Sequence, residues 1–366
     1  MSFLTFKKAF KFNQLSKFVL FIILSIVFIF NSSSAISFTT CNATVPSGIH
    51  NLANNITNYS TTCFTFTASN TVFDCQNNII DGVKNLSQRA FLSNTYNNIT
   101  IKNCFIEEFG NGINIIQSVG SSIYNVSVIE SFSGSNGVIY LYNFSNGILR
   151  NIYIDNYGVN VALGSLVLRN GADNNYLENI SLYNGGNGLH FRYADDNIIN
   201  NITVVNNSVA GIDLEFNSYR NIFTDVISLN NYVGIYYDST GDGNNFTKLF
   251  SSGNDYGIAA DSCGNFIINA STIHDNISLP NNFGVLFINN NFWKPEGITI
   301  GFGTINFTNN YYDASFSGTT FCPVPGYCDY FASSLFLETI TSSILPFQSI
   351  FSFLSLFIFV FFFLKY

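Results

Sequence analysis

Short apolar stretches and turn-forming residues alternate along most of the chain at a nearly constant spacing. Gly188, Gly211, Gly234 and Gly257 lie 23 residues apart, and LHFRY, IDLEF, IYYDS and IAADS follow them. Side chains in these segments alternate with a period of two, which indicates strands because successive strand residues point to opposite faces. A repeat of this length is typical of solenoids, in which each repeat forms one coil and stacked coils share a core.

A second apolar stretch follows an asparagine in most repeats, as in NNITI (97–101), RNIYI (150–154) and NNITV (200–204). Asn, Gly, Ser and Asp separate the stretches and favour turns. The pattern predicts an all-β chain folded as a single-stranded parallel β-helix, in which each strand pairs with its counterpart one coil away. We expect the asparagines to stack in one column and to bond amide to amide; they are Asn98, Asn125, Asn151, Asn179, Asn201 and Asn269.

The repeats resemble those of right-handed parallel β-helix proteins of the pectin-lyase-like superfamily. The nearest resemblance is to NosD-like and carbohydrate-binding and sugar hydrolysis repeat proteins of bacterial and archaeal surfaces. Cys41, Cys63 with FTFTASN after it, and FDCQNNIIDG at Phe73–Gly82 resemble the first coils of exported archaeal members. The resemblance covers roughly residues 41–310. It implies a right-handed parallel β-helix but no particular activity, because lyases, hydrolases, adhesins and structural rods share this fold.

Apolar segments flank the repeats at both ends. Phe18–Phe30 follows four lysines and precedes NSSSA, which predicts a secretory signal peptide over residues 1–35. Ser349–Leu364 is almost entirely apolar and is followed by Lys365, which predicts a transmembrane anchor over residues 344–366. An uncleaved N-terminal anchor and a removed lipid-anchor signal are the alternatives.

The expected domain organisation follows from these segments. Residues 36–310 form the β-helix ectodomain with its N-terminal cap, and residues 311–343 form a C-terminal cap or stalk. The predicted location is the extracellular face of a cell membrane. Lys and Arg number 14 against 22 Asp and Glu, a net charge of −8, which argues against nucleic acid as a partner.

Seven cysteines agree with an oxidising compartment. We expect Cys41–Cys63 to close a short N-terminal segment and Cys322–Cys328 to close the turn PVPGY. Zinc is the competing interpretation, but no CxxC pair is present. The odd number leaves one thiol over, and two cysteines inside the repeats are expected in the core: Cys104 and Cys263.

Alignment on the glycines places polar side chains on one outward face in two neighbouring columns. The first column contains His190, Asp213 and Tyr236. The second contains the following charged residues: Arg169, Arg192, Glu215, Asp238 and Asp261. In the catalytic interpretation, Asp213, Glu215 and Asp238 supply the two carboxyl groups that glycoside hydrolysis requires. His190, Arg192, Tyr236 and Asp261 would then bind the saccharide.

Two other interpretations of this face remain open. Clustered carboxylates also suit calcium, although the sequence predicts no dedicated metal site. The three histidines are far apart in sequence, and no methionine follows the leader, which disfavours copper. We favour a third interpretation, an ordinary charged ladder with His190 at the surface, because a constant period aligns any exposed residues.

Many asparagines lie in N-x-S/T sequences, and Asn55, Asn58 and Asn276 are the preferred glycosylation candidates because they lie in expected loops. Taken together, the sequence predicts a membrane-anchored extracellular β-helix that binds polysaccharide or neighbouring surface glycoproteins without catalysis. The alternative is a surface polysaccharide hydrolase or lyase with an acidic groove.

Overall fold

The computed structural model describes residues 35–131, 136–156, 164–281, 284–293, 298–302, 305–308 and 310–312. The signal peptide, nearly all of the C-terminal cap, the Cys322–Cys328 pair and the transmembrane anchor lie outside the described residues. In the described part, no helix has the length and apolar character needed to cross a membrane.

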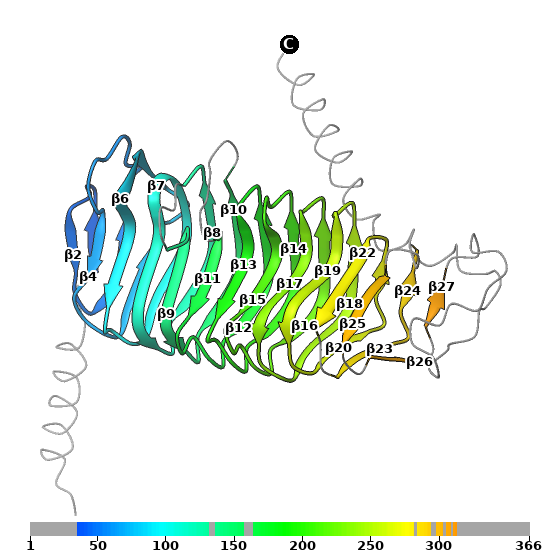
Figure 1. The fold of residues 1–366 in the computed structure, drawn as a ribbon. Helices are drawn as coiled ribbons and strands as arrows, with labels where there is room; N and C mark the ends of the chain where they lie inside the picture. Colours follow the sequence, from blue (N-terminus) through cyan, green and yellow to red (C-terminus); the bar gives the residue numbers. More distant parts are fainter. Residues whose placement is uncertain are drawn as a thin grey trace, which may run out of the picture.

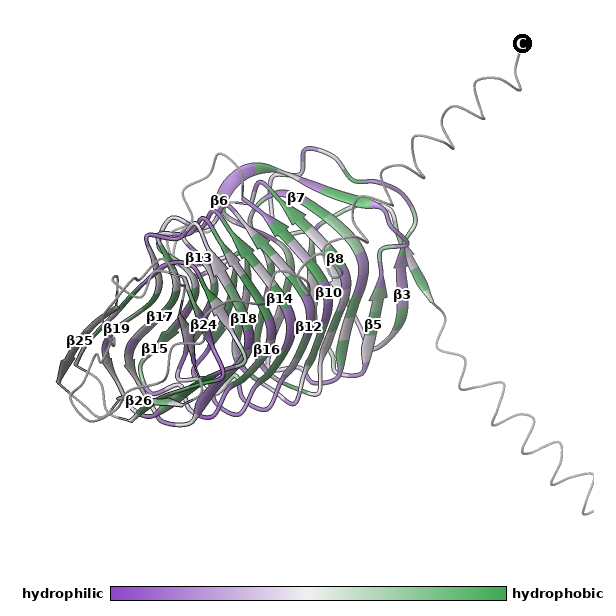
Figure 2. Ribbon diagram, turned by 90° about the vertical axis from the view of Figure 1, so that its right-hand side faces the viewer, coloured by the Kyte–Doolittle hydropathy of each residue, from purple (hydrophilic) through white to green (hydrophobic). Residues whose placement is uncertain are grey.

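The described residues form one stack of coils along a single axis (Figure 1). Each strand pairs in parallel with a strand of the neighbouring coil, as β12 does with β14 and β13 with β15. The stack contains about ten coils, so the predicted parallel β-helix is confirmed. Figure 2 shows hydrophobic segments recurring at the same place in successive strands.

Two series of strands alternate along the chain. The first series consists of β1 (Ile36–Phe38), β3 (Gly48–Leu52), β5 (Thr71–Asp74), β8 (Ser122–Ile129), β10 (Ile148–Asp155), β12 (Tyr176–Tyr183), β14 (Ile198–Val205), β16 (Ile222–Leu229), β18 (Asn244–Ser252), β20 (Phe266–Asn269), β21 (Thr272–Ile273), β23 (Val285–Ile288), β24 (Asn291–Phe292), β26 (Ile305–Thr308) and β27 (Tyr311–Tyr312).

The second series consists of β2 (Ala43–Val45), β4 (Phe64–Phe66), β9 (Ile139–Ser145), β11 (Leu166–Arg169), β13 (Asn187–Arg192), β15 (Ala210–Glu215), β17 (Val233–Thr240), β19 (Tyr256–Cys263), β22 (Asn276–Asn281) and β25 (Ile298–Phe302). Two long strands, β6 (Ile79–Asn94) and β7 (Ile99–Val119), pair with each other. β6 also pairs with β4, and β7 pairs with β5 and β8 of the first series and β9 of the second.

An exposed asparagine ladder marks the middle of the long strands of the first series. Each member after the first donates Nδ2 to the Oδ1 of the asparagine one coil earlier, at 2.8–3.0 Å, and the first donates to the Asp74 carboxylate at 2.9 Å. Every member has a φ between 51° and 57°. The members are Asn103, Asn125, Asn151, Asn179 and Asn201. Asparagine tolerates this left-handed backbone, which favours it here.

The predicted asparagine column is therefore confirmed in its centre and wrong at its ends. Asn98 belongs to another turn, where its Nδ2 donates to Asn70. Asn269 lies opposite Thr247 in a regular strand pairing and not at the left-handed position. Both asparagines precede an apolar stretch, but the coils there have a different local alignment.

Two further asparagine ladders are buried inside the coils. In one, each Oδ1 after the first accepts both the backbone N–H and the Nδ2 of the asparagine one coil earlier, at 2.9–3.1 Å. Its members are Asn175, Asn197, Asn221 and Asn244, all at most 1% exposed. The other runs through Asn207, Asn231 and Asn254 and ends on the Asp275 carboxylate. These ladders satisfy polar groups that would otherwise be buried without partners.

The glycines of the 23-residue repeat allow close approach between coils. A Cβ atom on Gly188 would lie 2.5 Å from the carbonyl oxygen of Gly211. A Cβ on Gly211 would lie 2.7 Å from the oxygen of Gly234, and one on Gly234 would lie 2.5 Å from that of Gly257. Any side chain at these three positions would force neighbouring backbones apart.

Two disulfides join adjacent coils at the N-terminal end. Cys41–Cys63 is present as expected, with Cα atoms 4.1 Å apart. Cys104 is not an unpaired core residue, because it forms a disulfide with Cys75 across a Cα distance of 4.9 Å. The 29-residue separation of this pair is one coil in length, so the chain brings the two cysteines side by side.

The three glycosylation candidates lie in different environments. Asn55 and Asn58 are exposed. Asn276 is half-buried, and its Nδ2 donates to the carbonyl oxygen of Asp255 at 3.0 Å. Glycan attachment at these positions stays a prediction.

Removal of one buried ladder amide should destabilise the whole stack. Asn221→Ala leaves the backbone N–H and Nδ2 of Asn197 without their acceptor, and the carbonyl of Ala194 without its donor. We expect a loss of about 3 kcal/mol in the free energy of unfolding, because each unsatisfied buried group costs about 1–3 kcal/mol. Chemical denaturation measures this loss. Asn179→Gly on the exposed ladder is the control and should cost about 1 kcal/mol or less; equal losses would contradict the assignment.

Candidate functional site

The strands β13, β15 and β17 carry the predicted polar face. Leu189, Ile212 and Ile235 lie opposite one another and are fully buried in the core. The next residue of each strand therefore points away from the core. His190, Asp213 and Tyr236 are register partners at this position, which confirms the first predicted column.

The second predicted column is confirmed as far as Asp238. Arg169 pairs with Arg192, Arg192 with Glu215, and Glu215 with Asp238. The prediction that Asp261 continues this column is wrong. Register shifts between Tyr237 and Thr240 place Ser262 opposite Asp238, and Asp261 instead accepts a hydrogen bond from the Tyr236 hydroxyl at 2.5 Å.

Facing away from the core does not make the first column accessible. His190 is 1% exposed and Asp213 is 2% exposed, so the expectation that His190 lies at the surface is wrong. Their neighbours earlier in the same column are also buried: Asn114, Tyr140 and Val167. Burial of polar side chains on an outward face marks this region as unusual, because such groups normally contact water.

His190, Asp213 and Glu215 form a compact cluster. His190 Nε2 lies 3.1 Å from Glu215 Oε2 and 4.0 Å from Asp213 Oδ2. Neither contact is aligned as a hydrogen bond, and the buried Nδ1 and Nε2 of His190 and Oδ1 of Asp213 have no hydrogen-bond partner. Asn187 Nδ2 donates to Asp213 Oδ2 at 2.6 Å and so fixes the orientation of this carboxyl.

The two carboxyl groups have pKa values shifted in opposite directions. Burial raises the pKa of Asp213 to about 7, and the nearby Glu215 and Asp238 carboxylates act in the same sense, against His190 and Asn187. Burial also raises the pKa of Glu215, but His190, Arg192 and Arg169 outweigh it, so the pKa of Glu215 lies below its usual value. Near neutral pH, Glu215 is ionised while Asp213 is close to half-protonated.

Arg192 stands at the edge of this cluster. Its Nη1 lies 3.8 Å from Glu215 Oε2. Its guanidinium carbon lies 4.3 Å from the centroid of the Phe216 ring, a cation–π contact that holds the side chain beside the cluster. Arg192 therefore offsets part of the negative charge of Glu215 from the edge of the cluster, where it lies over the Phe216 ring.

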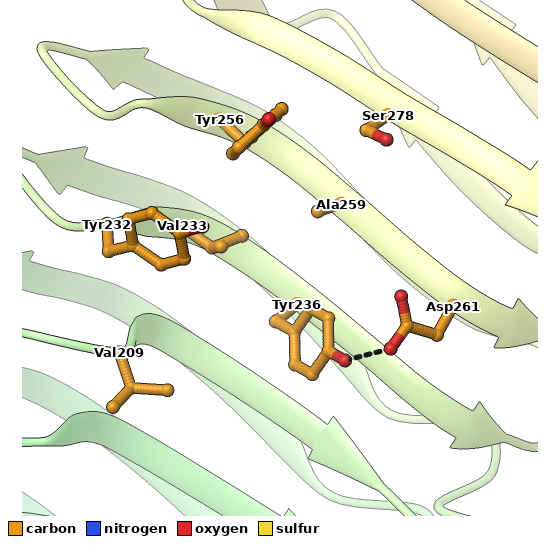
Figure 3. Close-up of a pocket in the computed structure, with 8 residues that line it drawn as sticks. All are labelled: Val209, Tyr232, Val233, Tyr236, Tyr256, Ala259, Asp261 and Ser278. Carbon is orange, nitrogen blue, oxygen red and sulfur yellow. Dashed lines mark hydrogen bonds between the residues drawn. The ribbon is translucent and has the colours of Figure 1, made fainter.

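A pocket of about 390 Å³ lies one coil further along the same face (Figure 3). Tyr232, Tyr236 and Tyr256 provide its aromatic wall, and Asp261 and Ser278 provide oxygen atoms. The rings of Tyr232 and Tyr256 are 6.2 Å apart and nearly perpendicular. Tyr232 is 53% exposed and Tyr256 is 36% exposed, so the wall is open to solvent.

The structure brings together some of the predicted site residues and separates others. His190, Asp213 and Glu215 form the cluster with Arg192 beside it, while Tyr236 and Asp261 belong to the pocket. Sequence analysis did not identify Asn187, Tyr232 or Tyr256. Tyr232 lies two residues before Gly234 and Tyr256 lies one residue before Gly257, so an aromatic residue just before a repeat glycine was the available signal.

No protein-family model matches the chain, and no curated protein matches it. The solved structures that resemble the chain include the following three. The Dettilon tailspike protein has a TM-score of 0.48 at 16% identity, over 74% of this chain and 60% of the tailspike, so this chain spans less than two thirds of that protein.

The other two structures are less similar. A hyperthermoactive exopolygalacturonase from Thermotoga maritima has a TM-score of 0.43 at 9% identity, over 74% of this chain and 83% of its own. PfbA, a surface adhesin of Streptococcus pneumoniae, has a TM-score of 0.35 at 12% identity, over 74% and 82%. All three TM-scores lie below 0.5 and all three identities lie below 25%. Activity does not follow from this likeness.

The burial of Asp213 should make stability depend on pH. Its pKa is raised from 3.8 to about 7 in the folded protein, so the folded state holds a proton that the unfolded state has lost. The stability contributed by the neutral carboxyl is present below about pH 4 and is lost as pH rises through about 7. Asp213→Asn keeps the shape and stays neutral. Relative to wild type, its free energy of unfolding should rise between pH 4 and 7 by on the order of 4 kcal/mol.

Denaturant unfolding at several pH values measures this difference, with a metal chelator in the buffer so that no bound cation affects the carboxyl groups. Asp196→Asn is the control, because the pairing of Asp196 with Arg220 lowers the pKa of Asp196 instead of raising it. That variant should show no rise over the same range. A pH-independent difference for Asp213→Asn would contradict a buried neutral carboxyl.

Proposed function

We propose that the protein binds neutral glycans in the tyrosine pocket of the β17–β19 face. The observation that carries the proposal is the aromatic wall of Tyr232, Tyr236 and Tyr256 beside the oxygen atoms of Asp261 and Ser278. Tyr232 and Tyr256 are exposed, and Tyr236 is half-buried. Ring faces pack against the C–H faces of sugars, while hydroxyl and carboxylate oxygens accept their O–H groups.

The dimensions and charge of the pocket narrow the ligand class. A volume of about 390 Å³ is at the small end of binding pockets and suits about one or two sugar units. Asp261 is its one charged lining residue, and the protein carries a net charge of −8. A neutral saccharide avoids the like-charge repulsion that a uronate would meet.

The position of the acid pair favours binding over hydrolysis. Asp213, Glu215 and Asp238 do not line the pocket. Asp213 is 2% exposed, which keeps its carboxyl away from a glycosidic oxygen. One observation supports the hydrolase alternative, because two nearby carboxyl groups with opposite pKa shifts are typical of an acid–base pair.

Export and membrane attachment complete the proposal. The leader at 1–35 and the apolar segment at 344–366 support a protein held on the extracellular face of a membrane. The two disulfides between N-terminal coils are consistent with an oxidising compartment. The glycans would then belong to neighbouring surface polysaccharides or glycoproteins.

Removal of either exposed tyrosine ring should weaken glycan binding. Screening the protein against a panel of neutral and uronic-acid oligosaccharides identifies the ligand, and titration calorimetry gives its affinity. We expect Tyr232→Ala and Tyr256→Ala each to lower the affinity about 10-fold, which corresponds to about 1.4 kcal/mol of lost ring contact.

Tyr153→Ala is the matched control, because Tyr153 is 39% exposed but lies on β10, outside the pocket. Loss of affinity in this variant as well, or no loss in the pocket variants, would reject the pocket. Product analysis of the same mixtures tests hydrolysis: cleavage that disappears in Glu215→Gln would establish the alternative instead.

The C-terminal segment should determine where the protein is found. A chain that lacks residues 344–366 should appear in the medium or the soluble periplasmic fraction, while the full chain should stay with membranes through salt and carbonate washes. Fractionation followed by immunoblotting measures the distribution. Release of the full chain by salt alone would exclude a membrane-spanning anchor.

A further inference from the structure

We propose that His190, Asp213 and Glu215 bind one divalent transition-metal ion, of which Zn²⁺ is the best-fitting example. Within the described ranges, these three residues are the one group of at least three His, Cys, Asp or Glu side chains whose candidate ligand atoms lie together, all within 4.8 Å of one another. The proposal does not depend on glycan binding, because none of the three lines the tyrosine pocket.

The distances between the ligand atoms fit tetrahedral coordination with small adjustments. Zinc–nitrogen and zinc–oxygen bonds of about 2.0–2.2 Å place neighbouring ligand atoms about 3.4 Å apart. His190 Nε2 lies 3.1 Å from Glu215 Oε2 and 4.0 Å from Asp213 Oδ2. All three candidate ligand atoms already lie within 4.8 Å of one another, so side-chain rotation of the carboxyl groups would bring them to this spacing around one ion.

The cluster also contains buried polar atoms without an aligned hydrogen bond, although His190 Nε2 contacts Glu215 Oε2 at 3.1 Å. His190 Nδ1 and Nε2 and Asp213 Oδ1 have no hydrogen-bond partner, and both side chains are at least 97% buried. Unsatisfied buried groups are costly, so their presence points to a ligand. An ion bound at Nε2 would give this nitrogen a partner and would bridge the imidazole to both carboxylates. The hydrogen bond from Asn187 to Asp213 Oδ2 holds this carboxyl in place, as hydrogen bonds from outer groups do for metal ligands.

The donor set selects the class of metal. Calcium and magnesium prefer sites made of oxygen atoms, whereas imidazole with carboxylates suits zinc and related first-row ions. Three protein ligands are also the number found in zinc sites that keep a fourth position for water. Glu215 is 21% exposed at its side chain, so it provides a path from solvent to the cluster.

Positive charge near the cluster does not occupy the proposed position. Arg192 approaches Glu215 only to 3.8 Å and lies over the Phe216 ring. Asp238, the register partner of Glu215, adds negative charge on the next coil and contributes to the field at Asp213. The carboxylates around the site therefore favour a cation.

Metal titration of the full-length protein in detergent tests the proposal. The protein is stripped with chelator, dialysed, and titrated with Zn²⁺, Mn²⁺ and Ca²⁺ separately, with bound metal counted by mass spectrometry. We expect one tightly bound Zn²⁺ per chain and weak or no binding of Ca²⁺ at the same site. His190→Gln, Asp213→Asn and Glu215→Gln should each weaken Zn²⁺ binding at least about 100-fold, since even outer-shell changes cost about 10–100-fold.

Two control variants keep similar chemistry outside the cluster. Asp261→Asn changes a carboxylate of the same face, and His274→Ala removes an imidazole that stacks on Trp293. Both should bind Zn²⁺ as wild type does. Circular dichroism in chelator confirms that each variant is folded, and X-ray absorption of the zinc complex should show an imidazole ligand that His190→Gln removes.

Three outcomes would overturn the proposal. They are the absence of stoichiometric Zn²⁺, equal Zn²⁺ binding in folded cluster variants, and a zinc spectrum without imidazole. Loss of glycan binding in Tyr232→Ala with Zn²⁺ retained would leave the metal site standing, so the two proposals can fail separately.

Discussion

In-register hydrogen bonding between successive coils is the interaction on which the rest of this structure depends. Every strand of the central coils pairs in parallel with its counterpart one coil away, and the buried asparagine ladders continue this bonding through the turns. A slip of one residue would exchange core and outward side chains along a whole strand. Hydrogen bonds in both the strands and the turns therefore hold the coils in this register. The repeat glycines allow it, because the backbones of neighbouring coils approach most closely there.

The same register creates the chemistry of the β13–β17 face. Residues 23 apart in sequence become neighbours about 4.8 Å apart, so His190 and Asp213 meet although no local motif joins them. Burial then separates the behaviour of the two carboxyl groups. Asp213 loses its contact with water and binds its proton more tightly, whereas Glu215 keeps partial exposure and gains positive neighbours. A repetitive architecture thus places two chemically different environments two residues apart on one strand.

A local departure from the register separates the cluster from the tyrosine pocket. Pairing between β17 and β19 shifts between Tyr237 and Thr240, and Asp261 leaves its expected column to bond Tyr236. The pocket lies on this coil and its neighbours, where the aromatic side chains preceding the repeat glycines are exposed. Bulges of this kind re-aim side chains at the edges of functional sites in other β-proteins. Here the face has an aromatic half, in which Asp261 is the one charged residue that lines the pocket, and a half with several charged residues.

The sequence by itself determined the architecture, because a period-two alternation at a constant repeat leaves little choice but stacked strands. It also determined both polar columns up to Asp238 and the Cys41–Cys63 disulfide. Only the tertiary structure decided the burial of His190, the Cys75–Cys104 bridge, the position of Asp261 and the buried asparagine ladders. The physical reason is that a repeat specifies which residues align, whereas burial and local register depend on how neighbouring coils pack.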